Sequence, residues 1–117
     1  MLHDPHTFAR DWIDAWNMHD LHRILSHYAS DVVLVSPAAA RLLNDPSGTV
    51  AGITALAGYF KRGLDAFPDL HFELIEILTG LSSIVLLFRN QGGTYTAEFM
   101  ELDPTGRIVR VVANYSG

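Results

Sequence analysis

The chain has 117 residues, of which 49% are hydrophobic, and carries a formal net charge of −5 at pH 7. This length provides for one hydrophobic core, so a single domain over residues 1–117 is expected. The acidic balance, without any block of like charges, argues against nucleic-acid and anionic-membrane partners, and no apolar run approaches the ~20 residues of a membrane span.

Two further features bear on the cellular compartment. The N-terminus lacks the basic and apolar regions of a signal peptide. The chain has no cysteine, which excludes disulfides, thiolate metal sites and cysteine nucleophiles. We interpret this as a cytoplasmic protein.

The N-terminal region predicts two helices. Asp4 and Pro5 are typical of a helix start, because aspartate caps free N–H groups and the missing N–H of proline costs nothing there. Three aromatic residues at four-residue spacing then share one face, namely Phe8, Trp12 and Trp16. After residues 17–19 interrupt the pattern, Asp20 can cap a second helix with the apolar face Leu21, Ile24, Leu25 and Tyr28.

The middle of the chain predicts a strand, a connection and a third helix. The β-branched run from Val32 to Ser36 is closed by Pro37 and predicts the strand. Residues 38–52 form a long connection that contains a strong turn signal at 44–48. The third helix ends at Pro68, and its apolar residues at three- and four-residue spacing are Ile53, Leu56, Phe60, Leu64 and Phe67.

From Leu70 onward the hydrophobic period changes from 3.6 to 2. Strands are expected near 70–79, 83–90, 94–103 and 107–115, and the tight turns between them predict an antiparallel meander. Three helices cannot all cover one side of a flat sheet of this size, whereas a strongly curved sheet can wrap around them. The predicted fold class is therefore α+β, a cone-shaped barrel of order α-α-β-α-β-β-β-β with an interior cavity.

This order and several local strings resemble the nuclear-transport-factor-2-like superfamily, in its polyketide-cyclase-like (SnoaL-like) and ketosteroid-isomerase-like branch. The strings are WNMHDL (16–21), HYASD (27–31), AGI (51–53), YFKRGL (59–64) and MELDPTGRI (100–108). The resemblance covers essentially the whole chain and implies the fold. It does not fix the activity, because the superfamily holds isomerases, dehydratases, cyclases, epoxide hydrolases and non-catalytic binders.

Position by position, the resemblance implies a changed active site. The general base of ketosteroid isomerases corresponds to Ser36, one oxyanion donor to Trp12 and the other to Glu98. Their supporting aromatic residues correspond to Tyr28, Phe60 and Tyr115. A serine cannot replace a carboxylate base unaided, and an indole N–H is a weaker donor than a phenol, so steroid isomerisation by that mechanism is not expected.

Glu98 is the leading candidate for a functional residue. Alternation along residues 94–100 fits either an inward or a surface glutamate, and the resemblance favours the inward one. The opposite sheet face would then be too apolar for water, with Ile75, Ile77, Val85, Leu87, Phe99, Ile108 and Val112. We therefore expect a homodimer through that outer face, centred on Phe99, Ile108 and Val112.

The remaining cavity residues have both a functional and a structural interpretation. Tyr28 and Tyr115 can hydrogen-bond Glu98 or a ligand, or they can be core aromatics. Ser36 can donate to a ligand or hold the turn through its own backbone. The expected ligand-binding wall is Trp12, Trp16, Phe60, Phe67, Phe72, Phe88, Met100 and Val111. The 38–50 segment is expected to be either a lid over the pocket or an ordinary loop.

Histidines do not predict a metal site. The pairs His19/His22 and His3/His6 have three-residue spacing but match no known zinc motif, and they fall at expected helix ends. We interpret them as solvated, and we expect no metal and no cofactor.

Two functions remain open from the sequence. The first is an enzyme of the isomerase, cyclase or dehydratase type that performs acid–base chemistry on an uncharged, largely apolar small molecule, with Glu98 transferring the proton and Tyr28 and Tyr115 assisting. The second is a non-catalytic protein in which the same cup binds a hydrophobic ligand or serves for dimerisation.

Overall fold

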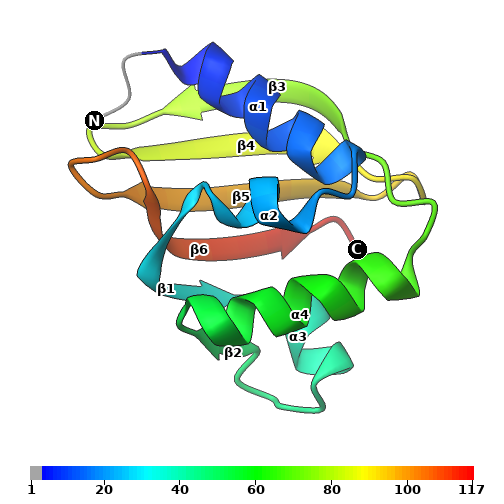
Figure 1. The fold of residues 1–117 in the computed structure, drawn as a ribbon. Helices are drawn as coiled ribbons and strands as arrows, with labels where there is room; N and C mark the ends of the chain where they lie inside the picture. Colours follow the sequence, from blue (N-terminus) through cyan, green and yellow to red (C-terminus); the bar gives the residue numbers. More distant parts are fainter. Residues whose placement is uncertain (1–3) are drawn as a thin grey trace.

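One curved six-stranded sheet and four helices make up residues 4–117, the part of the chain that this computed structural model describes (Figure 1). The helices are α1 (Pro5–Asn17), α2 (Leu21–Leu25), α3 (Pro37–Leu42) and α4 (Ile53–Ala66). The strands are β1 (Tyr28–Val35), β2 (Thr49–Ala51), β3 (Glu73–Thr79), β4 (Ser83–Arg89), β5 (Tyr95–Leu102) and β6 (Ile108–Tyr115).

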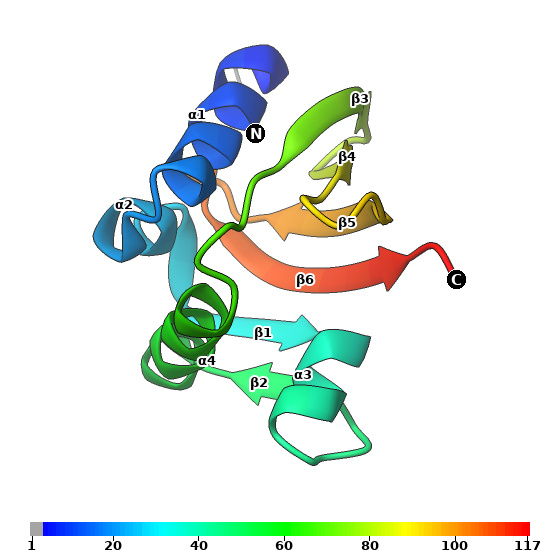
Figure 2. The same cartoon turned by 90° about the vertical axis from the view of Figure 1, so that its right-hand side faces the viewer.

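The sheet has the order β2-β1-β6-β5-β4-β3, and every neighbouring pair is antiparallel except β1 and β6. The predicted α+β class and the mainly antiparallel curved sheet are therefore confirmed. Figure 2 places α1, α2 and α4 on the same side of this sheet, where their apolar faces meet the strands. No helix within residues 4–117 is long and apolar enough to cross a membrane.

The segment predicted as a connection, residues 38–52, contains two further elements. Ser36 caps α3 by accepting the Ala38 N–H at 3.1 Å, and Pro37 occupies the first position of that helix. β2 pairs with the end of β1 and extends the sheet by one strand. Expecting three helices and five strands was thus wrong, because these elements of six and three residues are too short to display a hydrophobic period.

A second boundary also differs from the prediction. Tyr28 was placed on the apolar face of the second helix, whereas α2 ends at Leu25 and Tyr28 begins β1. Tyr28 follows Leu25 at a three-residue spacing, which fits a continuing helix as well as the start of a strand. Spacing alone therefore does not show where the helix ends and the strand begins.

The turn after α1 joins this helix to the chain entering β3. The side chain of Asn17 donates to the Phe72 carbonyl at 2.9 Å and accepts the Phe72 N–H at 2.7 Å, in the manner of a neighbouring strand. His19, at a φ of 54°, places its Nε2 2.8 Å from the Leu70 carbonyl. The expectation of a solvated His19 was wrong, whereas His22 is exposed and His3 lies outside the described residues.

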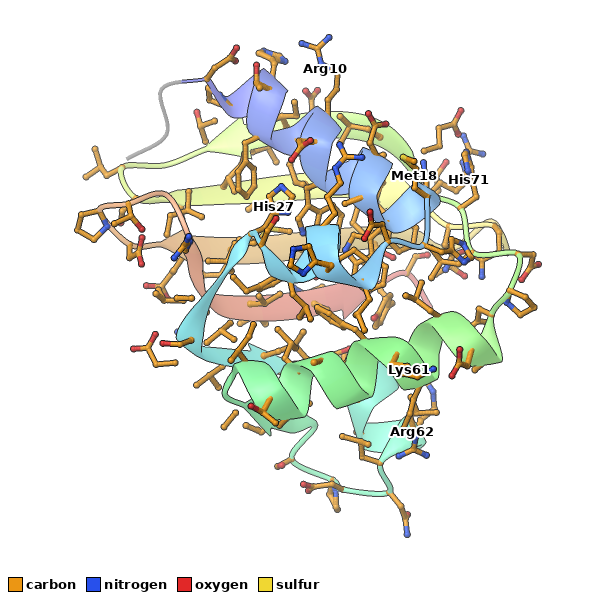
Figure 3. All side chains as sticks on the ribbon, viewed as in Figure 1. Arg10, Met18, His27, Lys61, Arg62 and His71 are labelled. Atoms are coloured by element: carbon orange, nitrogen blue, oxygen red, sulfur yellow. The ribbon has the colours of Figure 1, made fainter. Side chains whose placement is uncertain are left out.

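A small polar cluster joins α1 to α2. The carboxylate of Asp11 accepts from the Arg23 guanidinium and lies 2.8 Å from the Nε2 of His27, which is labelled in Figure 3. The hydrogen bond from Arg23 holds the pKa of Asp11 below its ordinary value. This cluster and the Asn17 contacts fix the position of α1 against the rest of the fold.

The last strand contains a β-bulge that changes which residues face the core. Ile108 pairs with Leu102 and Arg110 pairs with Glu101, which leaves Val109 as an extra residue on β6. Ile108 is consequently fully buried in the core. The prediction that Ile108 lies on the outer sheet face was wrong, because simple alternation cannot register an inserted residue.

A corresponding irregularity at Ile75 of β3 turns Ile77 toward the core, which corrects its predicted outer placement. Phe99 and Val112 pair with each other on the face that α1, α2 and α4 leave uncovered, and both are partly buried in the single chain. Val85 and Leu87 of β4 continue this apolar face.

Candidate ligand-binding site

A cavity of about 850 Å³ opens between α1, α3, α4 and the inner face of strands β4 to β6. Its size suits a drug-sized molecule. The walls are mostly apolar, and the main apolar side chains are Trp16, Leu34, Phe60, Phe67, Phe72 and Phe88.

The aromatic wall is a packed cluster rather than a set of separate rings. The ring centroids of Trp16 and Phe60 lie 4.7 Å apart in a T-shaped contact, and those of Phe72 and Phe88 lie 4.4 Å apart. Such contacts hold rings in place and keep water from the wall. Phe67 differs because 51% of its surface is exposed, which places it at the rim.

Glu98 is the only carboxyl side chain among the lining residues of this cavity in the described chain. It projects from the inner face of β5, between Leu86 of β4 and Ala113 of β6. Within residues 4–117 it forms neither a hydrogen bond nor an ion pair that would satisfy the carboxyl group. Burial raises its pKa to about 8, so the group is mostly protonated at pH 7 and can donate a hydrogen bond.

Behind the wall, Tyr28 forms a buried polar contact. Its hydroxyl accepts the indole N–H of Trp12 at 3.1 Å. Burial, with the charge of Glu98 as a second cause, raises the pKa of Tyr28, so this phenol stays protonated. The Nε1 of Trp16 is the one buried side-chain polar atom in the described region without a hydrogen-bond partner.

Toward α3, three hydroxyl groups gather at the cavity. Ser36 Oγ lies 3.2 Å from the hydroxyl of Tyr115. Burial raises the pKa of Tyr59, and the nearby hydroxyl of Ser36 partly opposes this effect. Burial and then the charge of Glu98 raise the pKa of Tyr115 to about 12. Arg41 of α3 lines the cavity beside them.

The structure divides the residues predicted for this site into two groups. The first group lines the cavity and comprises Trp16, Ser36, Phe60, Phe67, Phe72, Phe88, Glu98 and Tyr115. The second group does not line it and comprises Trp12, Tyr28, Met100 and Val111, which are buried in the core. The expected place of Trp12, Met100 and Val111 in the cavity wall was wrong, because periodicity identifies an inward side chain but not the depth at which packing fills the interior. Tyr28 is a core aromatic residue, which was one of its two interpretations.

Sequence reasoning missed Tyr59, Arg41 and Thr96 as lining residues. Thr96 could have been found, because it shares a strand face with Glu98. Tyr59 is the direct neighbour of Phe60 on the apolar side of α4, and its polar tip gave no signal of its own. Arg41 lies in the 38–50 segment, which was expected to be a lid or an ordinary loop, and its position depends on α3 being a helix.

No group of three or more His, Cys, Asp or Glu side chains that could hold a metal ion occurs in the region described, residues 4–117. The polar side chains that line the cavity carry instead hydroxyl groups, the amides of Asn90 and Gln91, one carboxyl and one guanidinium. These groups can donate hydrogen bonds, hold an acceptor atom and transfer a proton.

Comparison with known proteins gives one family match. The sequence profile of the SnoaL-like domain matches residues 9–114. No curated protein matches the sequence.

Several solved structures are similar over nearly the whole chain. A SnoaL-like protein of unknown function from Burkholderia thailandensis is 39% identical with a TM-score of 0.91, covering 97% of this chain and 95% of its own. IdmH from Streptomyces antibioticus, a proposed polyketide cyclase, is 19% identical with a TM-score of 0.79, over 97% and 93% of the two chains. A proposed ketosteroid isomerase from Kribbella flavida is 17% identical with a TM-score of 0.75, over 95% and 76%. The last two support the fold alone.

Proposed function

The chain belongs to the SnoaL-like domain family, and we propose that it binds a largely apolar carbonyl compound and moves a proton on it without a cofactor. Such chemistry is that of an isomerase, cyclase or dehydratase. The SnoaL-like fold includes proteins described as isomerases and polyketide cyclases, which agrees with this class.

The observation that carries the proposal is the unpaired carboxyl of Glu98 in an aromatic cavity. A carboxyl with a pKa of about 8 is protonated at pH 7 and can donate to a carbonyl oxygen as negative charge develops there. In its ionised form it is a stronger base than an ordinary glutamate and can take a proton from the adjacent carbon. The electron pair of that C–H bond then passes to the carbonyl oxygen and forms an enolate. When Glu98 returns a proton to a carbon of the enolate, the carbonyl is restored and Glu98 is ionised again.

The neighbouring residues have supporting roles in this proposal. Tyr115 lines the cavity and offers a hydroxyl to the substrate. Tyr28 acts from behind the wall, where its contact with Trp12 orients the phenol near Glu98. Ser36 stands where ketosteroid isomerases carry their base and caps α3, so their own reaction is not proposed.

The first test is ligand binding as a function of pH. The probe 2-acetonaphthone, a neutral apolar ketone, should bind the wild type with constant affinity from pH 5 to 7 and about tenfold more weakly at pH 9.5, because the ionised carboxyl can no longer donate to the carbonyl. Glu98→Gln should bind it equally at all these pH values. Fluorescence titration measures both affinities, and 2-ethylnaphthalene, which lacks the oxygen, is the control ligand. Identical pH profiles for the two proteins would exclude Glu98 as the carbonyl donor.

The second candidate function is non-catalytic binding. It is favoured by the observation that Glu98 has no second carboxyl beside it among the lining residues. Proton exchange separates the two candidates, because an enzyme that takes a proton from the ketone should replace the methyl protons of 2-acetonaphthone by deuterium in D₂O. Loss of that ¹H signal above the buffer rate, abolished in Glu98→Gln, supports the enzyme; exchange at the buffer rate supports the binder.

We also propose a homodimer through the outer sheet face. Phe99, Val112, Val85 and Leu87 leave an apolar face that water solvates poorly. Phe99→Lys should convert the dimer to a monomer, since a charge at the centre of an apolar interface is costly to bury. Size-exclusion chromatography with light scattering measures this, and Leu81→Lys, which alters the 91% exposed Leu81 between β3 and β4, is the matched control. A wild type that elutes as a monomer, or a Phe99→Lys variant that stays dimeric, would contradict the proposed interface.

A further inference from the structure

We propose that the α3 side of the cavity binds a carboxylate, so that the ligand is amphipathic, with an apolar body in the cavity and one acid group at Arg41. This inference rests on the proposed function and narrows its ligand class. It replaces a wholly uncharged ligand by one that carries a single negative charge away from the reacting carbonyl.

The first supporting observation is the state of Arg41. Arg41 is an exposed residue whose side chain lines the cavity, and within residues 4–117 it forms no ion pair and no hydrogen bond. Its neighbour Arg62 on α4, labelled in Figure 3, differs because it donates to the Leu42 carbonyl at 3.2 Å and does not line the cavity. The cavity therefore presents one guanidinium whose donors are free for a ligand.

The second observation is that α3 holds Arg41 on a fixed support. Ala39 is fully buried, and the Ser36 N–H donates to the Gly48 carbonyl at 2.9 Å. Gly48 has a φ of 58°, and a Cβ there would meet the Ser36 carbonyl oxygen at 2.5 Å, so the returning loop packs directly against the start of the helix. Arg41 thus extends from an anchored turn of helix rather than from a free loop.

The third observation is the supply of hydroxyl protons beside Arg41. Ser36 Oγ lies within hydrogen-bond distance of the Tyr115 hydroxyl, at 3.2 Å, and it also accepts the Ala38 N–H. Ser36, Tyr59 and Tyr115 have three hydroxyl protons, and the bond between Ser36 and Tyr115 uses one of them. The hydroxyl protons that remain can be donated to an acceptor outside this group. Burial raises the pKa of both tyrosines, and the positive charge of Arg41 opposes this rise slightly, which is consistent with its place beside them.

The charge of the site selects the kind of anion. Arg41 and Glu98 are the only charged side chains among the lining residues, all of which lie in the described region, and Glu98 is mostly neutral at pH 7. One cation balances one negative charge, which fits a carboxylate and leaves a phosphate dianion half-compensated. The planar guanidinium also matches the two oxygens of a carboxylate with parallel donors.

The test uses a matched pair of probes with one apolar body. In fluorescence titrations at pH 7, 4-(1-pyrenyl)butyrate should bind the wild type about tenfold more tightly than 4-(1-pyrenyl)butanol, the typical gain from a charge-assisted hydrogen bond. Arg41→Gln should remove this preference while leaving the affinity for the alcohol unchanged. Tyr59→Phe should reduce the preference in part. Arg62→Gln, which removes a neighbouring charge that does not line the cavity, should leave it intact.

The outcomes separate this inference from the proposed function. Equal binding of both probes to the wild type, or an undiminished preference in Arg41→Gln, would overturn the carboxylate site and leave the apolar cavity in place. Loss of the preference in Arg62→Gln as well would assign it to general surface charge and also overturn the site. Failure of the wild type to bind either probe would overturn the proposed function together with this inference.

Discussion

Replacing Glu98 with glutamine is expected to make the protein more stable than the wild type above pH 8 and to have no such effect near pH 4. The pKa of Glu98 is about 8 in the folded protein, against an ordinary value of 4.5. Between pH 4.5 and 8, Glu98 therefore keeps its proton in the folded state, whereas in the unfolded chain it has already lost it. The stability linked to this proton is fully present below pH 4.5, falls as pH rises, and is lost above pH 8.

The expected effect is large. When the folded state binds one more proton than the unfolded chain, the free energy of unfolding falls by about 1.4 kcal/mol for each unit by which the pH rises. Across the window this amounts to about 3–5 kcal/mol, the lower part of that range allowing for hydration of a side chain that faces an open cavity. Glutamine has no such proton, so the difference in stability between the variant and the wild type should grow steadily from pH 4.5 to 8.

Urea unfolding from pH 4 to 9 measures this difference at each pH. Other titrating groups contribute equally to both proteins and cancel in the comparison. Glu101→Gln is the matched control, because Glu101 lies on the outer face of the same strand and pairs with Arg110 at 3.3 Å. Parallel stability curves for Glu98→Gln and the wild type would mean that the carboxyl of Glu98 is hydrated and not raised in pKa.

Replacing Trp12 with alanine is expected to lower the free energy of unfolding by about 3–5 kcal/mol, because removal of a large core side chain leaves a cavity. Trp12 is fully buried, and its ring lies 5.5 Å from Phe88 and 6.0 Å from Phe72 between centroids. Its Nε1 also donates to Tyr28, whose hydroxyl would lose that partner. An effect of this size is a large fraction of the stability of a small domain.

The same substitution distinguishes core from cavity wall. Trp12→Phe retains a ring and should cost less stability, so it can be tested even where Trp12→Ala does not fold. We expect it to leave the affinity for 2-acetonaphthone nearly unchanged, whereas Trp16→Phe should weaken that affinity because Trp16 lines the cavity. If a stable Trp12→Phe variant no longer bound 2-acetonaphthone, Trp12 would be part of the ligand-binding wall after all.

The orientation of the Glu98 side chain, inward or outward, could not be decided from the hydrophobic pattern alone. Both faces of β5 carry apolar residues, since Phe99 lies on the outer face and Met100 in the core. Alternation therefore gave no decision, and the resemblance to known families was needed to predict an inward glutamate. Residues on the outer face posed the opposite problem, because the bulge at Val109 moved Ile108 inward without any mark in the hydrophobic pattern.

By itself, the sequence determined the class of fold, the curved sheet with helices on one side, and the existence of an interior. Hydrophobic period, capping residues and turn residues are local properties, and they act over a few neighbours along the chain. The helices at Pro5 and Ile53 and the four strands after Leu70 follow from such local signals.

Only the tertiary structure decided which inward residues fill the core and which leave space. Trp12 and Trp16 share one helix face and identical chemistry, yet Trp12 is enclosed by packing and Trp16 borders the cavity. The meeting of Arg41, Tyr59 and Tyr115 was equally decided there, because these residues come from α3, α4 and β6. The physical reason is that periodicity gives only the direction in which a side chain points. Whether that side chain is packed in the core or borders a cavity depends on the distance between the helices and the sheet, which the packing of the whole domain sets.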